Sequence, residues 1–179
     1  MPTPQLKSRL SSTLSSTLSS TLSSTLSSTL IALCLVTSVA AVAAVGSALP
    51  YDETADAKAE IRTTLKDAQR AHVPVLVVFG ANWCADCKLL DQAFKSGASA
   101  PLIAKNFRVI KVDVGRFDRN VDIAQAYGVP LKSGIPAVAI LSDKGKVVYA
   151  TREGELADAR KMGDNGIYDF FSKVVATAH

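Results

Sequence analysis

The stretch Val75–Phe94 reads VLVVFGANWCADCKLLDQAF. It begins with an apolar run and ends amphipathic, which predicts a buried strand, a short turn and a helix that begins at the two cysteines. Backbone N–H groups in the first turn of a helix have no intrahelical acceptor, and together with the helix dipole they favour a thiolate at Cys84. Cys87 lies almost one turn further, close enough to attack a mixed disulfide formed on Cys84. The spacing therefore predicts a pair that cycles between dithiol and disulfide, with Cys84 as the nucleophile and Cys87 as the resolving thiol.

Two motifs make the sequence resemble the thioredoxin superfamily. The first is the apolar strand followed by Trp83-Cys84-Ala85-Asp86-Cys87, and the second is Gly134-Ile135-Pro136, where that family carries a cis-proline loop facing the cysteines. The resemblance spans roughly residues 52–178. It implies a thioredoxin-like α/β fold and thiol–disulfide oxidoreductase activity. It also implies a cis bond before Pro136, and an Ile135 backbone that pairs with an extended substrate segment.

The sequence departs from the family pattern at two places. Cytoplasmic thioredoxins carry a buried acidic residue six positions before the first cysteine, where it assists proton transfer, whereas that position here is Val78. The loop after Val129 is also longer and carries Pro130–Ser133. The kinetics and partners of cytoplasmic thioredoxins therefore do not carry over directly.

The N-terminal residues 1–48 have the composition of a secretory signal. They contain no acidic residue, two basic residues, the sequence Ser-Ser-Thr-Leu repeated over residues 11–30, a mostly apolar run over residues 30–45, and small residues before a predicted cleavage site after Ala48. We therefore expect an exported, periplasmic domain of residues 49–179. The alternatives are an uncleaved segment that anchors the chain to the inner membrane and a serine-rich transit peptide.

Cysteine number and charge narrow the function further. Removing the signal takes Cys34 away and leaves only Cys84 and Cys87, whose short loop constrains the unfolded chain too little to serve as a structural crosslink. The redox-active disulfide is thus the only prosthetic element we expect, with no separate cofactor. The formal net charge falls from +4 to +2 when the signal is removed, which argues against a nucleic-acid partner.

The rest of the chain alternates helices and strands, which predicts a mixed central sheet with helices on both faces. Glycine-punctuated polar residues between the last strand and the last helix predict a solvated loop and a short helix over residues 153–164. The expected helices cover residues 52–70, 85–95, 101–106, 119–127 (capped by Asp118) and 167–176, and the expected strands cover 75–79, 107–114, 137–141 and 146–151.

Residues beside the cysteines are candidates for redox tuning and substrate binding. Asp86 places a negative charge between the thiols, which disfavours the thiolate, and Lys88 partly offsets it. Trp83 is either a flat apolar platform for a partner chain or a filler of the core, and we expect the platform. With Ile135 and Pro136, it forms the predicted substrate-binding set.

We expect an exported monomer that reduces protein disulfides and is itself restored by an upstream membrane thiol reductase. Asp86 favours the reductive direction, because strong oxidants stabilise their thiolate with a positive or polar residue at that place. A zinc site would need two further ligands, and the mature chain offers only His72 and His179. Delivery of copper, cytochrome assembly and non-catalytic binding remain the alternatives, because a thiolate pair also suits Cu(I).

Overall fold

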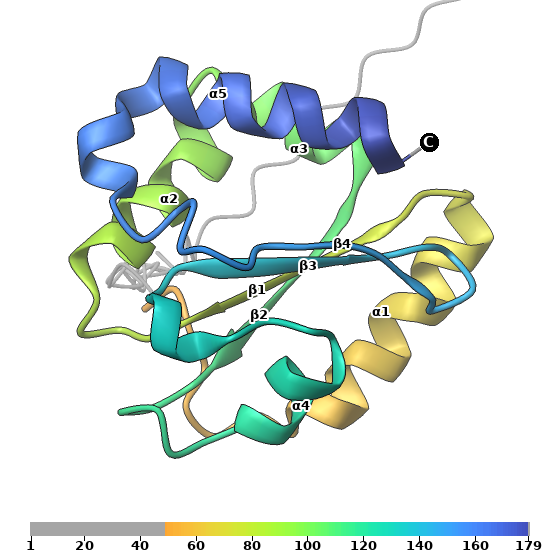
Figure 1. Cartoon of the computed structure of the whole chain (residues 1–179). Helices are drawn as coiled ribbons and strands as arrows, with labels where there is room; N and C mark the ends of the chain where they lie inside the picture. The colour runs from red at the N-terminus through yellow and green to blue at the C-terminus, as the bar shows by residue number, and fades with distance from the viewer. Residues whose placement is uncertain (1–48, 179) are drawn as a thin grey trace, which may run out of the picture. The chain divides into compact units, whose positions relative to one another are not determined.

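The computed structural model describes residues 49–178, which form a four-stranded sheet flanked by helices (Figure 1). The strands lie in the order β2-β1-β3-β4. They are β1 (Val75–Gly80), β2 (Arg108–Asp113), β3 (Ala137–Leu141) and β4 (Val147–Ala150). The helices are α1 (Ala57–Ala71), α2 (Ala85–Ser96), α3 (Ser99–Asn106), α4 (Val121–Ala126) and α5 (Ala159–Ala178), with a short 3-10 helix at Leu131–Ser133.

The sheet is mixed, as predicted. Strand β1 pairs in parallel with β2 and antiparallel with β3, and β3 pairs antiparallel with β4 in the predicted hairpin. The register places Gly80, the last residue of β1, opposite Asp113, the last residue of β2. Since two parallel strands end together, the turn into α2 and the loop after β2 leave the sheet at the same edge.

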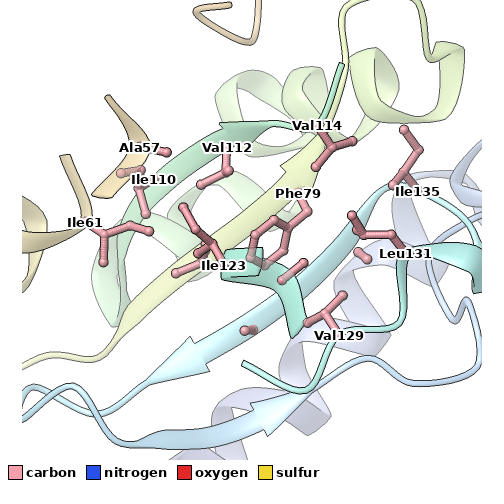
Figure 2. Packing of buried hydrophobic residues seen from close by; sticks show 14 of the residues in the cluster. Ala57, Ile61, Phe79, Ile110, Val112, Val114, Ile123, Val129, Leu131 and Ile135 are labelled. Carbon is pink, nitrogen blue, oxygen red and sulfur yellow. The ribbon is translucent and has the colours of Figure 1, made fainter. Parts of the chain in front are cut away.

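Strand β1 is buried at every position because helices cover both faces of the sheet. On one face, Phe79 packs with residues of α1 and α4, such as Ile61 and Ile123 (Figure 2). On the other face, Leu76 and Val78 pack with residues of α2, α3 and α5. We call the cluster around Phe79 the first core and the cluster around Leu76 and Val78 the second core. The two faces confirm the predicted thioredoxin-like α/β architecture with helices on both sides (Figure 1).

Two helices begin later than the sequence predicted. Helix α1 starts at Ala57 and is capped by Asp56, whereas the carboxylate of Asp52 accepts a hydrogen bond from the N–H of Thr54 in a preceding turn. Helix α4 starts at Val121, and the side chain of Asp118 does not cap it. Both aspartates satisfy nearby backbone N–H groups in turns, a use that competes with helix capping.

The segment before the last helix is also more ordered than predicted. Helix α5 begins at Ala159 and bends at Gly163, whose φ of 65° falls in the left-handed region. Most polar residues of the segment are exposed, as the predicted solvated loop requires, but Leu156 and Ala159 are fully buried in the second core and anchor it. Asp164, beyond the bend, accepts a hydrogen bond from the N–H of Ala98 at 2.8 Å, which ties α5 to the start of α3.

Among residues 49–178, no helix combines the length and the apolar character needed to cross a bilayer. The predicted signal over residues 1–48 lies outside the described residues.

Phe171 on α5 generates a stability prediction. Its ring is fully buried and meets the rings of Phe94 and Phe170 edge-on, each at 5.0 Å between centroids. Phe171→Ala should lower the free energy of unfolding by about 3–5 kcal/mol, because it leaves a cavity between three elements. The exposed Tyr168 on the same helix supplies the control, since Tyr168→Ala should change it by less than about 0.5 kcal/mol. Denaturant titrations measure both, and equal losses would contradict the packing described.

Candidate functional site

Cys84 is the N-cap of helix α2 and is joined to Cys87 by a disulfide. Its backbone is extended, and its sulfur accepts a hydrogen bond from the N–H of Cys87 at 3.1 Å. The sulfur therefore occupies the place that a serine or aspartate oxygen usually takes at a helix start. After reduction, the same N–H and the helix dipole act on the Cys84 sulfur and stabilise its thiolate.

The loop that precedes β3 faces Cys84. The peptide bond between Ile135 and Pro136 is cis, as the family resemblance implies, and the carbonyl oxygen of Ile135 lies 3.6 Å from the Cys84 sulfur. Gly134 has a φ of 113°, and a Cβ there would lie 2.7 Å from the Cβ of Ala157. The glycine thus allows the loop to approach the segment before α5.

The two sulfurs differ in their access to solvent. The residue Cys84 is 6% exposed, whereas Cys87 is 0% exposed and lies against the first core. An incoming disulfide can therefore reach Cys84 but not Cys87. This geometry supports the predicted roles, with Cys84 as attacking thiol and Cys87 as resolving thiol.

An apolar surface borders the reactive sulfur. Trp83 is 49% exposed, and its indole N–H donates to the carbonyl of Gly115 at 2.8 Å. Its ring meets that of Phe117 edge-on at 5.9 Å, and Phe117 is itself 44% exposed. Trp83 therefore does not fill the core, and it is held rigidly at the surface.

Phe117 also lines a groove of about 650 Å³ that runs beside the loop before β3. The other residues lining it are mainly apolar: Val121, Gln125, Val129, Pro130, Leu131, Lys132 and Gly134. Sequence reasoning missed Phe117, because nothing in the sequence around Arg116–Asp118 shows that this loop turns back toward Trp83. The longer loop over residues 130–133 supplies one wall of the groove.

Asp86 is paired with Arg160 rather than with Lys88. Its carboxylate accepts hydrogen bonds from the backbone N–H of Arg160 at 2.9 Å and from its Nε at 3.2 Å, while Lys88 points to solvent on α2. Burial alone would raise the pKa of Asp86, but the hydrogen bonds and the positive charge of Arg160 outweigh it and hold that pKa below its ordinary value. The positive charge that partly neutralises Asp86 therefore comes from Arg160 on α5, and not from Lys88 as the sequence predicted.

Asn82, two positions before Cys84, is a buried polar residue. The side-chain amide of Asn82 accepts from the N–H of Tyr51 at 3.0 Å and donates to the carbonyl of Tyr51 at 2.8 Å, and it also donates to Glu53 at 2.8 Å. These bonds hold the ring of Tyr51 in the first core, beside Cys87. The sequence carried no signal for this contact, since 31 positions separate Tyr51 from Asn82.

The described residues contain no group of three or more His, Cys, Asp or Glu side chains placed to hold a metal ion.

Comparisons with known proteins agree with this geometry. A thioredoxin-like family model matches residues 56–142, which include both cysteines and the loop before β3. The structure is similar to that of a disulphide isomerase from Xylella fastidiosa Temecula1, with 55% sequence identity, a TM-score of 0.68, and coverage of 70% of this chain and 96% of that one. The sequence is also 30% identical to a thioredoxin of Pseudomonas aeruginosa, over 53% of this chain and 79% of that protein.

The pairing of Asp86 with Arg160 predicts a pH-dependent stability difference. Because the folded-state pKa of Asp86 is lowered, its contribution is present above the carboxyl's ordinary pKa and is lost as the pH falls through the folded value. Asp86→Asn should therefore lower the free energy of unfolding by about 1 kcal/mol near neutral pH and by much less below about pH 3.

Denaturant titrations at the two pH values measure this difference. Asp67→Asn is the matched control, because Asp67 and Arg70 form an exposed ion pair on α1 that should contribute little at either pH. A loss for Asp86→Asn that is the same at both pH values would show that the ion pair is not its cause.

Proposed function

This chain belongs to the thioredoxin superfamily, and we propose that it is an exported thiol–disulfide oxidoreductase that reduces disulfides in protein substrates. The observation that carries the proposal is the disulfide at the N-cap of α2, whose outer sulfur accepts a backbone N–H and faces the cis-proline loop. A crosslink of such short span adds little to stability, so its chemistry is the better explanation of its presence.

The reaction proceeds through two thiol–disulfide exchanges. The Cys84 thiolate attacks one sulfur of the substrate disulfide, a mixed disulfide forms, and the other substrate sulfur leaves as a thiolate. Cys87 then attacks the Cys84 sulfur, the bond to the substrate breaks, and the second substrate thiolate leaves. The cysteine pair loses two electrons and two protons, and the substrate disulfide gains them as two thiols. A membrane thiol reductase supplies electrons to the pair for the next cycle.

The surface around Cys84 suits an extended, partly apolar protein segment. Trp83 and Phe117 provide exposed rings on one side of the sulfur, and the groove that begins at Phe117 continues toward the loop at Ile135 and Pro136. An apolar side chain near the substrate cysteine would bury surface in this groove, while the backbone around it pairs with Ile135. Trp83, Ile135 and Pro136 thus act as the substrate-binding set of the proposal.

The reductive direction rests on the charge of Asp86, two positions after the nucleophile. A negative charge near a thiolate raises its energy relative to the disulfide, which makes the dithiol more reducing. The ion pair with Arg160 partly neutralises that charge, so Asp86 raises the energy of the thiolate less than an unpaired carboxylate would. Disulfide isomerisation is the second candidate, and the name of the Xylella fastidiosa protein, which is 55% identical, favours it.

We also propose that the protein works as a monomer in the periplasm after cleavage at Ala48. The support is the basic, acid-free start of the chain, followed by an apolar run and small residues. Mass spectrometry of the protein recovered from the exported fraction should show an N-terminus at Leu49. An intact N-terminus on membrane-bound material would favour the anchor, and recovery from the cytoplasm would refute export.

The two cysteines should behave differently when replaced one at a time. Cys84→Ser should abolish reduction of insulin disulfides, whereas Cys87→Ser should accumulate mixed disulfides with protein partners, because only the resolving thiol is missing. Non-reducing electrophoresis of each variant, isolated after thiol trapping, shows the complexes, and Ala85→Ser serves as the control that leaves both thiols in place. Complexes on Cys84→Ser in place of Cys87→Ser would reverse the assigned roles.

The reduction potential of the pair separates reductase from isomerase. Equilibration against glutathione should give a value near the approximately −270 mV of thioredoxin and not the approximately −180 mV of protein disulfide isomerase. Asp86→Asn should raise it by about 30 mV, since it removes a charge that opposes the thiolate, while Asp67→Asn should leave it unchanged. A wild-type value near that of the isomerase would favour the second candidate.

A further inference from the structure

The resolving cysteine lies in surroundings that oppose its ionisation. Cys87 must attack as a thiolate, yet its side chain has no access to solvent and contacts the apolar first core. Burial in an apolar environment raises the pKa of a thiol, so an unassisted Cys87 would react slowly. The N–H of Cys87 at the helix start donates to the Cys84 sulfur instead. Val78, at the position where cytoplasmic thioredoxins carry an acidic residue, is apolar and packs on the opposite face of the sheet, in the second core.

Tyr51 brings a polar group close to Cys87. The point that a Cβ on Gly80 would occupy lies 2.2 Å from the Tyr51 hydroxyl oxygen and 3.0 Å from the Cys87 sulfur. Both atoms therefore border the small space above Gly80, which exists because that residue has no side chain. The residue Tyr51 is 2% exposed, and the two backbone hydrogen bonds to Asn82 hold it in position.

The charged groups around Tyr51 keep its hydroxyl protonated. Asp113, buried at the end of β2 opposite Gly80, faces it, and Glu53 and Arg119 lie beside Asp113. Burial, and then the charge of Asp113, raise the pKa of Tyr51 well above its ordinary value. Burial likewise raises the pKa of Asp113. A tyrosine in this position can donate a hydrogen bond but does not act as a base.

We propose that Tyr51 is a catalytic residue of the resolving step, in which its hydroxyl donates a hydrogen bond to the Cys87 thiolate. The inference rests on the proposed disulfide exchange and names a further residue for it. Cys87 attacks the Cys84 sulfur of the mixed disulfide, the bond to the partner breaks, and the partner thiolate takes up the proton that Cys87 released. Tyr51 keeps its own proton throughout. Its hydroxyl lies in the space above Gly80, and not at the position of Val78, where cytoplasmic thioredoxins carry their acidic residue.

Reaction of the fully reduced protein with dithiobis(nitrobenzoate) tests this role, because each of the two steps releases one coloured thiolate. The first release reports the attack of Cys84 on the reagent, and the second reports the attack of Cys87 on the mixed disulfide. In Tyr51→Phe, the second phase should be about 10-fold slower near neutral pH, and the pH midpoint of its rate should rise by about one unit. The first phase should keep both its rate and its pH midpoint.

Tyr149→Phe is the matched control, since it removes a tyrosine hydroxyl on β4 that faces Phe170 and not the cysteines. Tyr51→Phe keeps the ring and the backbone bonds to Asn82, and circular dichroism checks that it folds. Should it not fold, Gly80→Ala supplies a second test. Its Cβ would displace the hydroxyl and would also touch the Cys87 sulfur, so only slowing of the second phase together with the rise in its pH midpoint would count in favour of Tyr51.

An unchanged second phase, or a slower one without a shift in its pH midpoint, would overturn the role of Tyr51. Equal slowing of both phases would do so as well, since it would indicate a general loss of structure at the site. The assay uses no protein substrate and does not depend on the physiological direction. A wild-type protein that releases only one equivalent of the coloured thiolate would instead refute the proposed disulfide exchange itself.

Discussion

The hydrogen bond from the Cys87 N–H to the Cys84 sulfur is the interaction on which the site depends. It begins helix α2 and at the same time holds the outer sulfur in the field of the helix start. Few side chains combine capping with redox chemistry in this way, because the cap must be a hydrogen-bond acceptor and the reaction needs a stabilised anion. This one hydrogen bond, at the start of α2, thus contributes both to the fold and to the reactivity of Cys84.

That contact makes the two cysteines unequal. The helix start stabilises Cys84, which an incoming disulfide can reach, whereas Cys87 lies one turn further inside with neither solvent nor a free helix N–H beside it. A buried thiol in such a place needs a polar neighbour if it is to react quickly. The absence of a side chain on Gly80 leaves space for the Tyr51 hydroxyl, which enters from a segment before the first helix.

Sheet topology explains how the surface around Cys84 is assembled. Strands β1 and β2 are parallel and end at the same edge of the sheet, and the segments that follow them carry Trp83 and Phe117. Strand β3 is antiparallel to β1, so it begins at that same edge, directly after the loop with Ile135. Three segments far apart in the sequence therefore meet at the reactive sulfur. Because the sheet is rigid and buried on both faces, the surface they form is preorganised for an extended partner.

By itself, the sequence determined the central strand, the helix start at Cys84, the loop before β3 and the mixed sheet, because each depends on apolar runs and residue types that act over a few positions. It did not determine that Asp56 caps α1 or that no aspartate caps α4, since aspartates near a helix start can also bond to N–H groups in turns. Only the tertiary structure decided that Asp86 pairs with Arg160 and that Tyr51 lies beside Cys87. These contacts join residues that are distant along the chain, and their geometry follows from how the helices pack on the two faces of the sheet.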